Sequence, residues 1–215
     1  MKKYRQNKKR SKNKYSNEAG FSFVEFLVSV GLGVVVLSAV FSLDVLAKQS
    51  FVVNTTALDI HTGARNAMDW LTRDIRWASQ ITPSKTISAT LYTSGTSELV
   101  LEIPSIDVSG DIIPGVFDYV AYRAINTTNN KKLQRVILLG AGSQRNGATR
   151  DVTIYLDATT PVVFQSEGGT LLSNVADKST VSQLQVTLNT KKKTLSSSNV
   201  IETLTSVVEL RNRTE

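Results

Sequence analysis

The pattern of apolar and polar positions begins with one unusually long apolar segment. Residues 21–43 read FSFVEFLVSVGLGVVVLSAVFSL, and Glu25 is the single charged side chain among these 23 residues. As a helix, the segment spans about 35 Å, slightly more than the ~30 Å hydrocarbon core of a bilayer. The pattern therefore predicts a transmembrane helix over residues 21–43.

The helical pattern continues beyond this segment, because the chain contains no proline before Pro83. From residue 60 onward, apolar residues recur at spacings of three and four, which places them on one face of a helix. These residues are Ile60, Ala64, Ala67, Met68, Leu71, Ile75 and Ala78. We therefore expect one long helix over residues 21–80, whose second half packs on a globular head. Arg65, Asp69 and Arg73, at i, i+4 steps, suggest a ladder of ion pairs on its outer side.

Beyond Pro83 the period shortens to that of β-strands separated by turn residues. The runs predicted as strands are 98–103, 119–125, 132–139, 152–156, 161–164, 181–188 and 203–210. The polar loop 126–131 lies between two of them and indicates an antiparallel hairpin, while Lys191–Lys193 is predicted as part of a solvated loop. The expected fold class is α+β: a long N-terminal helix packed on a mostly antiparallel β head over residues 81–215.

Charge is concentrated at the start of the chain. Residues 1–20 hold eight of the 25 Lys and Arg residues and one of the 18 acidic residues, so the remainder carries 17 of each sign. The net charge of +7 thus belongs to an N-terminal tag, and direct binding of nucleic acid is not expected from composition. Eight basic residues beside an apolar segment favour a tag that stays cytoplasmic, with the chain after Asp44 crossing the membrane.

Candidate catalytic and metal-binding residues are few. The chain has no cysteine, which excludes disulfides and thiolate sites. His61 is the only histidine, so a Ser/His/Asp triad would have to use it. Asp107, Asp111 and Asp118 share one loop region, but their spacing matches no standard calcium loop and favours solvated turn carboxylates. Trp70 and Trp77 lie seven apart on one helix, which favours core packing. We expect no enzyme activity, no cofactor and no metal.

Three interpretations of the N-terminal region remain open on residues alone. The segment is a plain single-pass anchor, a cleavable secretory signal with a small-residue site at Val45-Leu46-Ala47, or a processed anchor in which Glu25 has a purpose. The apolar run is longer than the ~7–15 residues of a signal core. A carboxylate inside an apolar span costs ~2.5–3.5 kcal/mol at mid-bilayer and less near an end, so Glu25 is a candidate functional residue.

The junction at residues 12–43 resembles the N-terminal signal of type IV prepilins and pseudopilins. That signal is a basic leader ending in Gly, followed by Phe, three apolar or hydroxyl residues and Glu, as in Gly20, Phe21 and Glu25 here. The resemblance implies cleavage between Gly20 and Phe21 by a prepilin peptidase on the cytoplasmic side, which removes residues 1–20, and N-methylation of Phe21. It further implies that Glu25 pairs with the N-terminal amine of a neighbouring subunit.

The head is similar to J-type minor pseudopilins and W-type minor pilins in three short segments: Trp70–Arg76, Leu133–Arg135 and Leu210–Asn212. This implies a type IV pilin-like architecture and a structural minor subunit that helps to initiate or cap a pilus or a type II secretion pseudopilus. Its partners would be other subunits, the peptidase, the inner-membrane assembly platform and lipid, with the head on the extracytoplasmic side of a bacterial inner membrane. The alternative is a membrane-anchored binding domain that does not polymerise.

Overall fold

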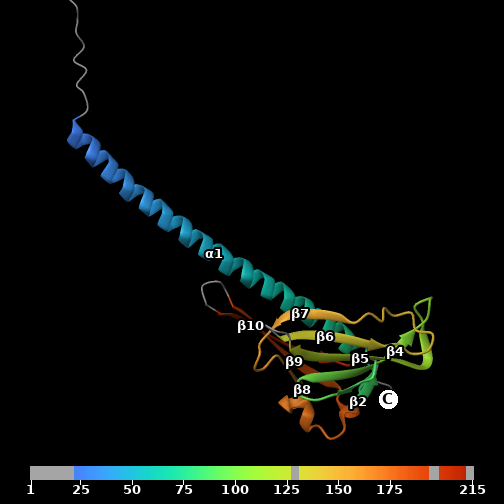
Figure 1. Cartoon of the computed structure of the whole chain (residues 1–215). Helices are drawn as coiled ribbons and strands as arrows, with labels where there is room; N and C mark the ends of the chain where they lie inside the picture. The colour runs from blue at the N-terminus through green and yellow to red at the C-terminus, as the bar shows by residue number, and fades with distance from the viewer. Residues whose placement is uncertain (1–21, 127–130, 194–198, 212–215) are drawn as a thin grey trace, which may run out of the picture. The chain divides into compact units, whose positions relative to one another are not determined.

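The computed structural model describes residues 22–126, 131–193 and 199–211, apart from the side chain of Ile154. Helix α1 (Phe23–Trp77) is followed by a β-rich region (Figure 1). The chain divides into two compact units, Met1–Lys48 and Gln49–Glu215, and their boundary falls inside α1.

The first unit contains the apolar part of α1. This helix is long and apolar enough to cross a membrane, as predicted. Every described residue from 22 to 51 is exposed, including Phe23, which is 74% exposed, and Leu37, which is 69% exposed. A continuous apolar surface of this kind requires a non-aqueous environment or a protein partner to cover it.

The second unit is a mostly antiparallel sheet with the C-terminal part of α1 packed on it, which confirms the expected α+β class. Within the described residues, eight strands form one sheet in the order β1-β4-β5-β6-β7-β9-β10, and β8 pairs with β9. Their bounds are β1 Gln80–Ile81, β4 Glu98–Ile106, β5 Ile112–Asn126, β6 Lys131–Leu138, β7 Arg150–Leu156, β8 Val162–Ser166, β9 Gln183–Lys193 and β10 Asn199–Glu209. Each of the predicted strands overlaps one of these, and the predicted hairpin is β5–β6.

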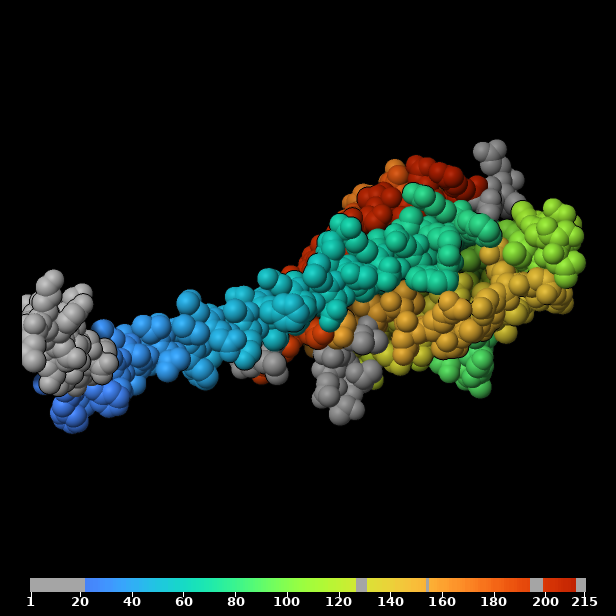
Figure 2. Space-filling view, turned by 90° about the horizontal axis from the view of Figure 1, so that it is seen from above, coloured from blue at the N-terminus to red at the C-terminus, as the bar shows by residue number. Residues whose placement is uncertain are grey.

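The core lies between α1 and one face of this sheet. The predicted apolar helix face is buried as expected: Ala64, Leu71 and Ile75 are 0% exposed. Strand β4 alternates, so that Leu99 and Leu101 point towards the helix and join the same cluster. In Figure 2 the C-terminal part of α1 lies over the head with β10, drawn in red, along one side.

The opposite face of the sheet is covered by an element that the sequence pattern did not predict. Strands β2 (Ser84–Ile87) and β3 (Thr90–Thr93) form a separate hairpin, and its Ile87 and Tyr92 pack on Val100, Ala121 and Val136. The turn consists of Ser88 and Ala89 with φ of 48° and 64°. Two-residue turns of this hand normally carry Asn or Gly, so this pair gave no turn signal.

Three predictions about local structure were wrong. Helix α1 ends at Trp77 and not at Gln80, because the chain there turns into the sheet: Ser79 N–H donates to the carbonyl of Glu102 at 2.8 Å. Lys191–Lys193 belongs to strand β9, which pairs with β10 along its length. The outer ladder of α1 does not form in the described residues, where Arg73 lies 4.0 Å from Asp74 and Asp69 takes part in no ion pair.

Three short 3₁₀ turns connect β8 to β9: η1 (Glu167–Gly169), η2 (Leu172–Asn174) and η3 (Lys178–Thr180). Leu172 is fully buried and anchors this connection in the main core.

Candidate functional site

The first candidate site is the start of α1. Gly20 and Phe21, the predicted cleavage and methylation residues, lie outside the described residues. Glu25 lies in the first turn, where its Oε2 accepts a hydrogen bond from the backbone N–H of Ser22 at 3.2 Å. The Ser22 hydroxyl oxygen in turn accepts from the backbone N–H of Val24 at 3.3 Å. The arrangement is similar to a capping box, except that the Ser22 hydroxyl accepts from the second helical residue and not the third, and it satisfies donors that a helix start leaves unpaired.

The cap gives Glu25 a local role that sequence reasoning had missed, although Ser-x-x-Glu before an apolar run is a known signature of a helix start. A carboxylate in the first turn is also favoured by the helix dipole. A glutamine would provide the same hydrogen-bond acceptor without the charge. The local role and the predicted pairing with a neighbour's amine are therefore separable by substitution.

The second region with unusual chemistry is a buried polar network under the end of α1. Asp74, which is 6% exposed, accepts hydrogen bonds through Oδ2 from Tyr122 Oη and from Arg135 Nε, both at 2.6 Å. Burial, together with the charge of Asp74, raises the pKa of Tyr122 well above its usual range. Burial opposes the charge on Arg135, but Asp74 outweighs it, so the pKa of Arg135 lies above its ordinary value. The network is thus a charged pair with a neutral tyrosine.

A second buried carboxylate, Asp118, is fully enclosed. It accepts hydrogen bonds from Ser105 Oγ at 2.8 Å, from the backbone N–H of Gly140 at 2.7 Å and from Ser143 Oγ at 2.8 Å. Arg145 Nε lies 2.9 Å from its Oδ2. The partners come from β4 and from the segment after β6, so Asp118 fixes that segment against the sheet. Burial lowers the pKa of Arg145, while Asp118 works in the opposite direction.

The loop carboxylates do not form a shared site. Asp107 Oδ1 accepts from the backbone N–H groups of Ser109 and Asp111, at 2.8 and 3.0 Å, and so closes its own turn. The prediction of a solvated turn carboxylate was wrong for Asp118, which lies on β5 and is fully buried in the network described above. Over the described ranges, no group of three His, Cys, Asp or Glu side chains is arranged to hold a metal ion.

The only histidine has a structural partner. His61 Nδ1 contacts Glu202 Oε1 on β10, and Asp59, two residues earlier, accepts from Lys192 Nζ on β9 at 3.2 Å. Lys192 also donates to Tyr155 Oη at 3.2 Å. These contacts join α1 to strands β9 and β10 of the sheet.

The tryptophans are not in the core, contrary to expectation. Trp77 is 45% exposed, with the guanidinium of Arg145 4.7 Å from its ring centroid. Trp70 borders a cavity of about 470 Å³ and has the guanidinium of Arg73 3.8 Å from its ring centroid, with those of Arg135 and Arg150 at 5.3 and 5.6 Å. Both indole rings therefore make cation–π contacts with nearby guanidinium groups.

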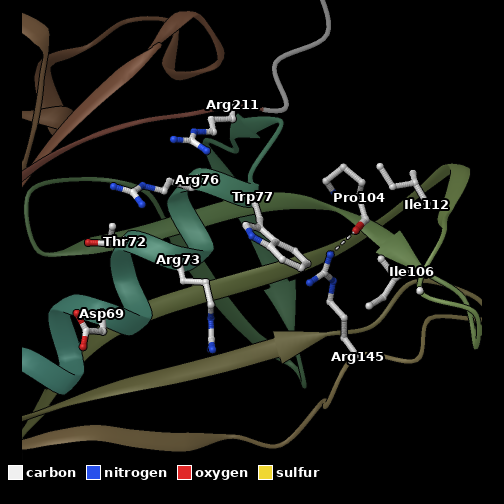
Figure 3. Close-up of a pocket in the computed structure, with 11 residues that line it drawn as sticks. Asp69, Thr72, Arg73, Arg76, Trp77, Pro104, Ile106, Ile112, Arg145 and Arg211 are labelled. Carbon is white, nitrogen blue, oxygen red and sulfur yellow. Dashed lines mark hydrogen bonds between the residues drawn. The ribbon is translucent and has the colours of Figure 1, made fainter.

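A second cavity of about 600 Å³ adjoins the first at the C-terminal end of α1. We call it the arginine groove; it is defined by Arg73, Arg76, Trp77, Ile106, Arg145 and Arg211. In Figure 3 the side chains of Arg76 and Arg211 lie near one another, and Arg145 reaches from a separate segment beside Trp77. The backbone N–H of Arg211 donates to the carbonyl of Arg76 at 3.3 Å, which holds the two residues together.

The groove was not predicted. Arg73 and Arg76 are neighbours on α1, but Arg145 and Arg211 are far from them in sequence, so only the segment Trp70–Trp77 gave a local signal. Its chemistry is that of an anion-binding surface, because guanidinium groups match carboxylate and phosphate geometry and remain charged. Comparison of the sequence with protein-family models and with curated proteins gives no match.

Proposed function

We propose that this chain is a minor subunit of a type IV pilus or type II secretion pseudopilus, made as a membrane precursor and cleaved after Gly20. The observation that carries the proposal is the junction of a basic leader, Gly20, Phe21 and Glu25 with the apolar segment. After cleavage the apolar half of α1 remains attached to the head. It first serves as a membrane anchor and then packs against other subunits in the filament.

Two structural observations support this proposal. The apolar half of α1 exposes large apolar side chains over its described length. Lipid would cover them in the membrane, and neighbouring helices would cover them in the filament. The other half of α1 completes the core of a mostly antiparallel head, an arrangement that suits a subunit displayed on a helical stem. The competing function, a membrane-anchored binding domain that does not polymerise, shares both features and differs in processing.

Processing tests the proposal directly. When the chain is co-expressed with a prepilin peptidase, we expect the mature protein to begin at Phe21 and to carry a methyl group on its amine. Gly20→Leu is expected to leave the full 23.5 kDa precursor in the membrane, because the peptidase must fit a small residue beside the scissile bond. Intact-mass and N-terminal peptide mass spectrometry measure both outcomes.

Gly31→Leu is the matched control, since a Cβ at Gly31 meets nothing within 4 Å and the residue lies away from the junction. It should be processed like the natural chain. A natural chain that begins at Met1 or Lys48 would contradict the proposal and favour the anchored binding domain or a conventional signal.

The role of Glu25 is tested by comparing two substitutions. Glu25→Gln keeps an acceptor for the N–H of Ser22 and removes the charge, whereas Glu25→Ala removes both. If the charge pairs with a neighbour's amine, both variants should insert and be cleaved but should lose incorporation into filaments to a similar extent. Incorporation is measured by shearing filaments from cells and quantifying the subunit by immunoblotting.

Glu25→Asp, which keeps the charge on a shorter side chain, is the control and should retain part of the incorporation. Normal incorporation of Glu25→Gln alongside failure of Glu25→Ala would reduce Glu25 to a helix cap. Normal incorporation of both would leave it without an assembly role.

A further inference from the structure

The arginine groove carries an excess of positive charge that the described residues do not neutralise. Its described lining contains four guanidinium groups and one carboxylate, Asp69. Two of the cations are already engaged: Arg145 with Asp118 at 2.9 Å, and Arg73 only loosely with Asp74 at 4.0 Å. Asp74 itself is occupied by other donors.

The other two cations, Arg76 and Arg211, have no carboxylate within 4.0 Å among the described residues, and both are exposed. Their side chains lie near one another in Figure 3, and a hydrogen bond joins their backbones. Neighbouring like charges repel, so an anion placed between the two guanidinium groups is attracted by both and reduces their mutual repulsion. Arg76 alone is explained by the negative end of the α1 dipole, but Arg211 reaches the same place from the chain beyond β10.

The lining is also partly apolar. Pro104, Ile106 and Ile112 border the groove beside Trp77, and Ile112 is 60% exposed. A free inorganic anion would leave these surfaces uncovered. A short ligand with both anionic and apolar groups would pair with the arginines of the groove and cover its apolar residues.

Charge balance favours a short ligand over a long polyanion. Of the four guanidinium groups that line the groove, only those of Arg76 and Arg211 have no carboxylate within 4.0 Å among the described residues, so the charge open to a ligand is a pair of side chains and not an extended positive track. Nucleic acid binding depends on many phosphate contacts along such a track. Carboxylates, in contrast, are matched by one or two guanidinium forks each.

We propose that the arginine groove binds a short acidic segment of a partner protein, with a carboxylate held by Arg76 and Arg211 and an apolar side chain packed beside Ile106. The inference goes beyond the filament function and does not depend on it, because the groove lies within the second compact unit, residues 49–215. Binding of this kind is expected to weaken with salt, since the two arginines are solvent-exposed.

The test uses the full-length chain in a neutral maltoside detergent. The probe is a fluorescein-labelled peptide of alternating aspartate and leucine, compared with the same peptide carrying asparagine for aspartate, and with labelled hexathymidylate. Fluorescence anisotropy measures affinity. The two tryptophans of the chain are Trp70 and Trp77, so a change in intrinsic fluorescence on adding unlabelled peptide reports occupation at this place.

We expect the aspartate peptide to bind at least tenfold more tightly than the asparagine peptide. The double variant Arg76→Gln with Arg211→Gln should lose about tenfold in affinity, and Arg76→Lys with Arg211→Lys should retain most of it. Arg65→Gln is the matched control: Arg65 is exposed on the same helix, outside the groove, and its loss should leave binding unchanged.

Equal binding of the two peptides, no binding of either, or an equal loss in Arg65→Gln would overturn the proposal. Tighter binding of hexathymidylate than of the aspartate peptide would also overturn it; loss of that binding in the double variant Arg76→Gln with Arg211→Gln would identify the groove, and not the basic residues 1–20, as the nucleic-acid surface.

Discussion

A fragment that begins at Pro83 is expected to aggregate, whereas one that begins at Gln49 should be soluble and monomeric. The longer fragment corresponds to the second compact unit and lacks the apolar half of α1. The shorter one also lacks the helix residues that cover the sheet, including Ala64, Leu71 and Ile75, which are fully buried. Its sheet would expose a continuous apolar face of the kind that drives association.

The deletion also removes Asp74, so that Arg135 and Tyr122 would lose their shared acceptor. Size-exclusion chromatography and circular dichroism compare the two fragments. A single substitution gives an independent version of the same test: Leu71→Asp in the longer fragment should cause aggregation, whereas Leu58→Asp should not, because Leu58 is 65% exposed. A Pro83 fragment that folds and remains monomeric would show that α1 does not complete the core.

Asp74→Ala is expected to destabilise the head by about 3–5 kcal/mol, because removing one partner of a buried ion pair leaves the other charge uncompensated. Arg135 would keep its charge with its guanidinium largely enclosed, and Tyr122 would lose its acceptor. The measurement is the free energy of unfolding in urea, for the fragment that begins at Gln49 and for its variant.

Asp151→Ala provides the control, since Asp151 makes an equally short contact of 2.6 Å with Lys132 but at a more exposed position. Its loss should cost about 1 kcal/mol or less. Asp74→Leu combined with Arg135→Met should recover much of the loss, because an apolar pair leaves no buried charge. If Asp74→Ala and Asp151→Ala lowered the free energy of unfolding by similar amounts, burial would not determine the contribution of the Asp74–Arg135 pair.

The buried network and the arginine groove are physically connected. Arg73 lies beside Asp74 and borders both cavities at the end of α1. Asp118 holds Arg145, which contributes to the groove from the segment after β6. The buried carboxylates thus position some of the guanidinium groups and leave Arg76 and Arg211 as the exposed pair for a ligand.

Local periodicity along the chain was enough to predict several features. A run of 23 residues with one charge is long enough to span a bilayer whatever follows it. Apolar spacing of three and four placed Ile60, Ala64, Leu71 and Ile75 on one helix face, and alternation identified the longer strands. These features hold because side-chain direction is set by the backbone repeat within a few residues.

The positions at which polar side chains meet depend on the folded arrangement of distant segments. Asp74 reaches Tyr122 and Arg135 because the register of β5 and β6 places them under the last turns of α1. Arg76 and Arg211 become neighbours because β10 ends where α1 ends. Trp77 was predicted to be buried but borders a groove. Such contacts depend on strand register and on how the chain closes over long sequence separations, and no pattern within one segment contains that information.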